Sequence, residues 1–184
     1  MAFVSEEALI NYGSKIELSE SKDFIKAAYG GIKHTVFLSH SHKDITAIKG
    51  FIKILSRQGI NIYIDSLDPS LPTITNCQTA DKIKSKIKDI EFFWVLATTS
   101  ALNSRWVPWE IGIADSIKTR DKIFIIPVSD TTGKFTGNEY LQLYHRLELN
   151  QTGTIFEAYA PGSNKSILLS YILNEAQIIR SVLD

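Results

Sequence analysis

The chain has 184 residues, 44% hydrophobic and 22% charged, which is ordinary for one globular domain with a substantial core. Lys plus Arg and Asp plus Glu number 20 each, so the formal net charge is zero, which argues against a nucleic-acid binder held by bulk positive charge. The single cysteine, Cys77, excludes an intrachain disulfide, and no apolar run approaches the roughly 18 residues that span a bilayer.

The N-terminal segment is expected to be helical and to precede the main domain. Residues 5–12 and 20–29 have helical character, and Gly30-Gly31 ends the second stretch. The segment lacks the basic region and long apolar stretch of a signal peptide, so the sequence predicts a cytoplasmic protein. We therefore predict an N-terminal helical extension over residues 1–32 and one domain over residues 33–184.

Strands and helices are expected to alternate along the rest of the chain. Apolar or β-branched runs predict strands at 34–39, 60–65, 92–97, 122–128 and 153–159. Apolar residues at helical spacing predict helices at 45–57, 79–89, 104–118, 138–147 and 164–182. We expect Asp44 to cap the first of these helices, and Asn103 or Ser104 to cap the third. The alternation is typical of an α/β fold, so we predict a flavodoxin-like, doubly wound sheet of five parallel strands in the order 2-1-3-4-5.

Ligands of such sheets bind beyond the carboxyl ends of the strands, so the loops at that edge are the candidates for function. The segment Ser39-His40-Ser41-His42-Lys43-Asp44 follows the first strand and lacks the glycines of a dinucleotide fingerprint. Its hydroxyl and backbone N–H groups suit a phosphate or a ribose, and they equally suit a polar turn that caps the next helix. His40 and His42 have no further His or Cys at ligand spacing, so we predict no metal site.

Glu110 lies one helical turn after Trp106, shortly after the apolar strand at 92–97. Residues four apart share a helix face, so the two side chains are expected to point the same way. A carboxylate beside an indole near the end of a sheet strand suits chemistry on a sugar or nucleotide. A solvated glutamate and a packing tryptophan fit the same spacing.

Three motifs resemble those of Toll/interleukin-1 receptor-like (TIR) domains. The segment HTVFLSHSHKD, residues 34–44, resembles the family's first box, a strand that ends in F-x-S and is followed by an acid. Residues 59–65 resemble the second strand, which leads into the long BB loop, and Ser104-Arg105-Trp106 followed by Glu110 is similar to the S-x-W-x-x-x-E pattern of enzymatic members. The resemblance covers about residues 33–180 and is greatest to bacterial stand-alone TIR proteins, some of which act in Thoeris-like anti-phage defence.

The resemblance implies cleavage of NAD⁺ at the nicotinamide–ribose bond, with NAD⁺ as the substrate and no cofactor. Glu110 matches the catalytic glutamate of the family. The substrate-binding residues that the resemblance implies are Ser39, His40, Ser41, Asp44, Asp65, Ser66, Leu67 and Trp106. Water as the acceptor would give ADP-ribose, and an internal hydroxyl would give a cyclic ADP-ribose isomer.

One carboxylate suits this chemistry. Nicotinamide leaves a cationic pyridinium as a neutral molecule, so no general acid has to protonate it, whereas ordinary glycosidases use two carboxylates. Glu110 would stabilise an oxocarbenium-like transition state electrostatically.

Three functions remain open at this point: a TIR enzyme that hydrolyses or cyclises NAD⁺, a non-catalytic TIR interaction module that assembles through its BB loop, and a related nucleotide hydrolase or base-exchange enzyme. All three share the fold, so the fold does not choose among them. The resemblance also implies a homo-oligomer formed through TIR–TIR contacts and a separate effector protein that responds to the nucleotide product. No nucleic-acid or membrane partner is expected.

Overall fold

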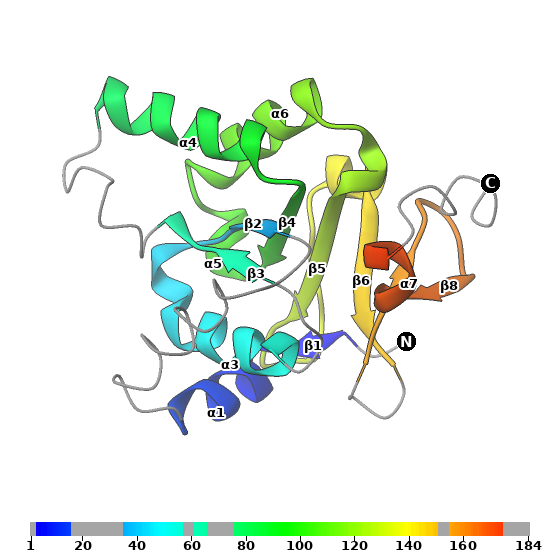
Figure 1. The fold of residues 1–184 in the computed structure, drawn as a ribbon. Coiled ribbons are helices and arrows are strands. Elements are labelled where there is room, and N and C mark those ends of the chain that lie inside the picture. Colours follow the sequence, from blue (N-terminus) through cyan, green and yellow to red (C-terminus); the bar gives the residue numbers. More distant parts are fainter. Residues whose placement is uncertain (1–2, 16–34, 57–60, 66–75, 151–154, 175–184) are drawn as a thin grey trace.

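The computed structural model describes residues 3–15, 35–56, 61–65, 76–150 and 155–174, and in these ranges a central sheet has helices on both faces (Figure 1). The strands are β1 (Val4–Ser5), β2 (Thr35–Ser39), β3 (Asn61–Tyr63), β4 (Phe92–Ala97), β5 (Ile123–Ser129), β6 (His145–Leu149), β7 (Phe156–Tyr159) and β8 (Ser166–Leu168). The α-helices are α1 (Glu6–Ser14), α3 (Ile45–Ser56), α4 (Cys77–Asp89), α5 (Thr99–Leu102), α6 (Val107–Ile117) and α7 (Leu169–Asn174). The 3₁₀ helices are η1 (His42–Asp44), η3 (Arg120–Lys122) and η4 (Glu139–Leu143).

Parallel pairing dominates the sheet. Its strands follow the order β3-β2-β4-β5-β6-β7-β8, with parallel pairs from β3 to β6 and antiparallel pairs from β6 to β8. The first four predicted strands are β2, β3, β4 and β5, and they lie in the predicted relative order 2-1-3-4. The expectation of an α/β fold built on a mainly parallel sheet is confirmed.

The far side of the sheet differs from the prediction of five parallel strands. The segment predicted as a helix over 138–147 forms η4 and then β6, which takes the place beside β5. The predicted fifth strand is β7, one place further out and antiparallel, and the predicted last helix begins as the edge strand β8. In β6 the charged residues Arg146 and Glu148 alternate with leucines, which is a strand pattern of period two. The helix was predicted here because charged residues among leucines are also typical of a helix that is half exposed.

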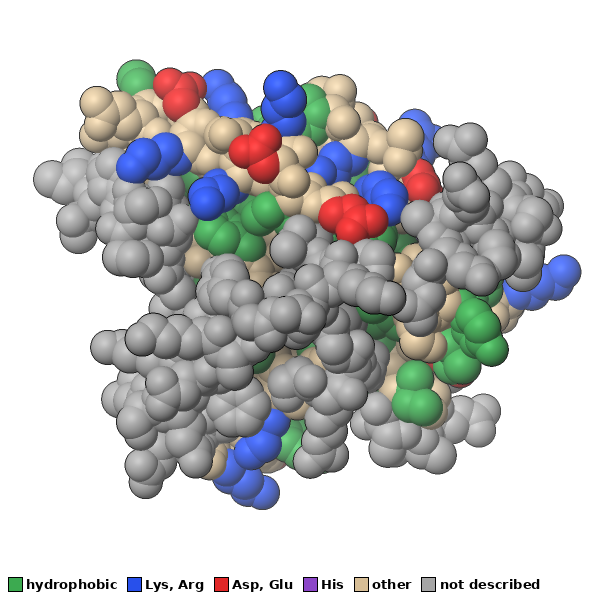
Figure 2. Space-filling view, viewed as in Figure 1, with side chains coloured by type: hydrophobic (Ala, Val, Ile, Leu, Met, Phe, Trp, Pro, Cys, Tyr) green, Lys and Arg blue, Asp and Glu red, His purple; other side chains and the backbone are tan. Residues whose placement is uncertain are grey.

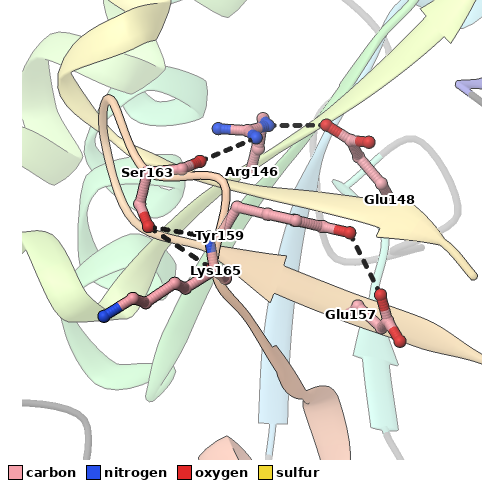
Figure 3. A network of polar contacts seen from close by, with 6 residues as sticks. All are labelled: Arg146, Glu148, Glu157, Tyr159, Ser163 and Lys165. Atoms are coloured by element: carbon pink, nitrogen blue, oxygen red, sulfur yellow. Dashed lines mark hydrogen bonds and ion pairs between the residues drawn. The ribbon is translucent and has the colours of Figure 1, made fainter. Parts of the chain in front are cut away.

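A polar network holds this antiparallel end together (Figure 3). The Arg146 guanidinium donates to Glu148 Oε1 at 2.5 Å and to the Ser163 carbonyl at 2.9 Å, and it lies 4.5 Å from the centre of the Tyr159 ring. The Tyr159 hydroxyl donates to Glu157 Oε2 at 3.0 Å. These contacts connect β6, β7 and the turn before β8, so the edge of the sheet is closed by side chains as well as by strand pairing.

The strand β4 separates two hydrophobic cores. Successive side chains of a strand point to opposite faces, and all six side chains of β4 are buried, as expected for a strand covered on both sides. Phe92, Trp94 and Leu96 belong to the core that contains residues of α1, α3 and α7. Phe93, Val95 and Ala97 belong to the core that contains residues of α4, α5 and α6.

The N-terminal segment begins with a strand that pairs with the end of β5. Val4 pairs in parallel with Val128, and the side chain of Ser5 accepts a hydrogen bond of 3.1 Å from the N–H of Ala8, which caps α1. The helix predicted over 5–12 is therefore present as α1. The helix predicted over 20–29 lies outside the described residues, as do residues 175–182 of the predicted last helix.

Two glycines bring α1 against α3. A Cβ atom at Gly13 would lie 1.9 Å from the Thr46 carbonyl oxygen, and one at Gly50 would lie 2.0 Å from the Leu9 carbonyl oxygen. These distances are far shorter than any ordinary contact, so neither position has room for a Cβ atom. The backbones of α1 and α3 therefore cross at Gly13 and Gly50.

Charged side chains of both signs are interspersed over α4, at the upper edge of the face shown in Figure 2. In the described ranges, no helix combines the length and the hydropathy needed to cross a membrane.

We expect Gly50→Ala to destabilise the protein by about 1–3 kcal/mol, because the added methyl group would overlap the backbone of α1. The matched control is Gly112→Ala in the exposed middle of α6, where a Cβ atom meets nothing within 4 Å. There alanine should stabilise by up to about 1 kcal/mol, because it is the better helix former. Urea denaturation of both variants measures the two changes, and effects of equal sign would contradict the proposed crossing.

Candidate functional site

A buried carboxylate meets the end of the first parallel strand. Glu110 is 3% exposed and accepts a hydrogen bond of 2.5 Å from the hydroxyl of Ser39, the last residue of β2. Side chains two apart on a strand share a face, so Ser39 lies on the same face as Phe37, which is in the core that α6 covers. The buried stripe of α6 has the helical spacing expected for a core-facing side and consists of Val107, Glu110, Ile111 and Ala114.

Burial gives Glu110 an unusual protonation equilibrium. The pKa of Glu110 is raised to about 8: burial raises it most, the negative charge of Asp65 also raises it, and the hydrogen bond from Ser39 lowers it. At neutral pH these surroundings therefore favour the protonated form. A cation placed beside the carboxyl group would lower its pKa and favour the ionised form.

His40 and Asp65 lie beside this pair, at the ends of β2 and β3. His40 Nδ1 is 2.9 Å from the carbonyl oxygen of Leu38 and 3.6 Å from Asp65 Oδ1. The structure thus brings together four of the predicted site residues, Ser39, His40, Asp65 and Glu110, from two strand ends and one helix. Ser66 and Leu67 lie outside the described residues.

Asp44 occupies a different place from the predicted helix cap. Ser41 caps η1 by accepting the N–H of Lys43, and α3 continues directly from that 3₁₀ turn. Asp44 is the last residue of the turn, and its carboxylate accepts a hydrogen bond of 2.5 Å from Thr98, after β4. The prediction of an Asp44 cap was wrong because a buried partner distant in sequence engages the side chain.

Trp106 precedes α6, which begins later than predicted. The predicted start at Asn103 or Ser104 belongs to a turn after the short helix α5, and the Ser104 hydroxyl accepts the N–H of Trp106 at 3.1 Å. Pro108 lies in the first turn of α6, as expected. The Trp106 ring packs edge-on against Trp109, with centroids 5.1 Å apart, so the contact that the structure gives this indole is one of packing.

A cleft of about 360 Å³ with polar lining residues lies between the loops that follow β2 and β4, and neither Ser39 nor Glu110 lines it. One wall is the loop that continues from Ser39, and the other is the segment between β4 and α6. The lining residues are Ser41, His42, Lys43, Thr99, Ser100, Asn103 and Ser104. Of these, only Ser41 was predicted as a site residue. The run Thr98-Thr99-Ser100 directly after an apolar strand is the signal that would have indicated the second wall.

A larger cavity, of about 490 Å³, lies on the β5–β6 side and is lined by Ile125, Tyr144, Arg146 and residues 135–138, among others. None of the predicted site residues lines it. Over the described ranges, no three His, Cys, Asp or Glu side chains cluster as metal ligands would.

Comparison with known proteins identifies the family. A model of the TIR domain matches residues 36–158, which include β2, β4, β5 and the whole of α6. The chain belongs to the TIR domain family.

Two curated relatives carry related names. One, from Bacillus cereus (strain MSX-D12), is named "Probable 3' cyclic ADP-D-ribose synthase ThsB'" and is 29% identical over 136 residues, covering 70% of this chain and 69% of the relative. The other, from Cytobacillus dafuensis, is named "Putative cyclic ADP-D-ribose synthase TIR2" and is 31% identical over 101 residues, covering 53% of this chain and 26% of the relative.

We expect Glu110→Gln to stabilise the protein increasingly as the pH rises. The unfolded chain releases the Glu110 proton near the ordinary pKa of 4.5, whereas the folded protein holds it up to about 8. The wild type therefore loses stability as the pH rises between these values, and glutamine, which mimics the neutral acid, does not. One pKa unit corresponds to about 1.4 kcal/mol, so the advantage of the variant should reach a few kcal/mol near pH 8.

Urea denaturation of both proteins at several pH values between 4.5 and 8 measures this difference. The control is Glu139→Gln, at an exposed position of η4, which should leave the pH dependence unchanged. A Glu110→Gln curve parallel to that of the wild type over the whole range would show that the carboxyl group titrates normally.

Proposed function

We propose that this protein cleaves NAD⁺ at the nicotinamide–ribose bond, releasing nicotinamide together with ADP-ribose or a cyclic ADP-ribose isomer. The observation that carries the proposal is the buried Glu110, held by Ser39 at the carboxyl edge of the sheet. The resemblance of its motif to S-x-W-x-x-x-E supports a catalytic role for this glutamate. The names of both curated relatives, which describe cyclic ADP-D-ribose synthases, support the same reaction.

Glu110 would act on the charge of the reacting ribose. As the bond to nicotinamide breaks, positive charge develops on the ribose ring, and a carboxylate in a site of low dielectric stabilises that charge strongly. The raised pKa favours the neutral form of Glu110 at neutral pH. The cationic pyridinium of the substrate would lower that pKa and so favour the ionised form. The carboxylate would thus form where and when the reaction needs it.

The cleft lined by the loop after Ser39 and by the segment that leads into α6 would receive the rest of the dinucleotide. Its hydroxyl and amide groups suit ribose, and Lys43 at its rim suits a diphosphate. Ser39 and His40 remain the predicted contacts to ribose or diphosphate. The other predicted substrate contacts are Ser41, Asp44, Trp106 and the start of the BB loop, Asp65, Ser66 and Leu67.

The biological setting belongs to the same proposal. The resemblance to stand-alone bacterial TIR proteins supports a cytoplasmic enzyme that makes a nucleotide signal in anti-phage defence. A separate effector protein would respond to that product. The substrate NAD⁺ would be the reactant, with no cofactor required.

Purified protein is expected to release nicotinamide from NAD⁺, and Glu110→Gln should lower the rate by about 100-fold or more, the usual cost of removing an electrostatic stabiliser of the transition state. Glu139→Gln, at an exposed position, should retain the wild-type rate. Chromatography and mass analysis of the nucleotide product distinguish hydrolysis from cyclisation.

Two other results would each favour an alternative. Equal nicotinamide release by the wild type and Glu110→Gln would remove Glu110 from the mechanism. If NAD⁺ stayed intact at high protein concentration, a panel of other nucleotides would test the related hydrolase, and intact nucleotides throughout would favour the non-catalytic interaction module.

We also propose that the protein works as a homo-oligomer formed through TIR–TIR contacts, in which a neighbouring copy completes the site. Specific activity should then rise with protein concentration. Initial rates of NAD⁺ cleavage over a wide range of protein concentrations measure this. A rate strictly proportional to protein concentration would contradict the proposal.

A further inference from the structure

A buried hydrogen bond joins the loops that follow β2 and β4. The hydroxyl of Thr98 donates to Asp44 Oδ2 at 2.5 Å across 54 positions of sequence, and the two side chains are 0% and 4% exposed. The same hydroxyl oxygen accepts the N–H of Ala101 at 3.0 Å and so caps α5. The Thr98 side chain therefore holds both the start of α5, in its own loop, and Asp44, in the loop that follows β2.

Asp44 gathers donors from both walls of the polar cleft. Burial raises the pKa of Asp44, while hydrogen bonds from the Thr98 hydroxyl, the Ser41 backbone and the Ser100 side chain lower it. Ser41 lines one wall of the cleft and Ser100 lines the other. Asp44 itself is buried and does not line the cleft, and the groups that engage its carboxylate come from both walls.

A link at this place affects the geometry of the whole candidate site. The loop that Asp44 ends begins at Ser39, the partner of Glu110. The segment that Thr98 begins leads through Ser104 into α6, which carries Glu110. Moving the two loops apart would widen the cleft. The Ser39–Glu110 hydrogen bond joins β2 to α6 and does not itself hold the two loops together.

We propose that Asp44 and Thr98 are positioning residues, whose hydrogen bond sets the separation of the two cleft walls and thereby the affinity for the polar part of the substrate. This inference rests on the proposed cleavage of NAD⁺. It assigns Asp44 a role in holding the cleft walls, in place of the direct substrate contact expected from the sequence.

The test compares Thr98→Val, which removes the hydroxyl and keeps the shape, with Thr98→Ser, which keeps the hydroxyl. For NAD⁺ cleavage, Thr98→Val should raise KM about tenfold and change kcat by less than about twofold, because it weakens binding without touching Glu110. Thr98→Ser should restore the wild-type KM. The control Thr119→Val lies at an exposed threonine whose side chain makes no capping hydrogen bond, and it should change neither constant.

Asp44→Ala separates the link from the capping of α5, since it leaves the hydrogen bond between Thr98 and Ala101 intact. If the link is what matters, the KM of Asp44→Ala combined with Thr98→Val should not exceed that of the more affected single variant. A raised KM in Asp44→Ala with a wild-type KM in Thr98→Val would instead show that Asp44 contacts the substrate itself. If Asp44→Ala does not fold, amide protection in residues 39–45 of Thr98→Val still separates the two roles, because the cap of α5 acts only on the Thr98 side.

Hydrogen exchange measured by mass spectrometry tests the link without any activity. Thr98→Val should lose amide protection both in residues 39–45 and in residues 98–104, whereas Thr98→Ser should keep it. Unchanged protection in Thr98→Val would overturn the proposal even in an active enzyme. Lost protection in a protein that does not cleave NAD⁺ would leave the link standing and show that the proposed function had failed.

Discussion

The candidate site of this TIR domain depends on the burial of one carboxyl group. Glu110 occupies a position of α6 that would normally hold an apolar residue, and its hydroxyl partner, Ser39, lies at the end of a buried strand. Burial disfavours the charged form, so the carboxyl group keeps its proton to a higher pH and its pKa is raised to about 8. A cation beside such a group favours its ionised form, which matches the proposed substrate and the charge that would develop in the transition state.

The two halves of the sheet have different roles. The parallel half brings the ends of β2, β3 and β4 to one edge, and the helices on both faces leave that edge open to a ligand. The antiparallel half, from β6 to β8, ends the sheet through strand pairing and the network around Arg146. Beside the parallel half, α1 docks on α3 through Gly13 and Gly50. The parallel strands therefore position the candidate site, and β6 to β8, α1 and α3 stabilise the sheet that carries it.

Side chains at the carboxyl edge divide into those that face the cleft and those that hold its walls. Ser41 and Ser100 line the cleft, whereas Asp44 and Thr98 are buried, bond to each other and do not line it. Residues of both kinds are small, polar and close together in sequence, so residue type alone does not separate them. Burial and the identity of the hydrogen-bond partner do, and they turn a list of candidate contacts into two groups with different expected effects on KM and kcat.

The sequence by itself determined the α/β class, the order of the first four strands and the choice of Glu110 and Ser39 as candidate site residues, because these depend on local periodicity and on short, specific motifs. The hydrogen bond between Ser39 and Glu110 came only from the structure. The sequence did not determine β6, where a helix was predicted. There Arg146 and Glu148 pair with each other on one strand, and in the sequence these two charged residues among leucines are compatible with a helix. Nor did it show that Asp44 turns away from its own helix toward Thr98, or that α6 starts only at Val107. Those outcomes depend on partners far away in the chain, and only the folded chain decides which polar groups are buried together.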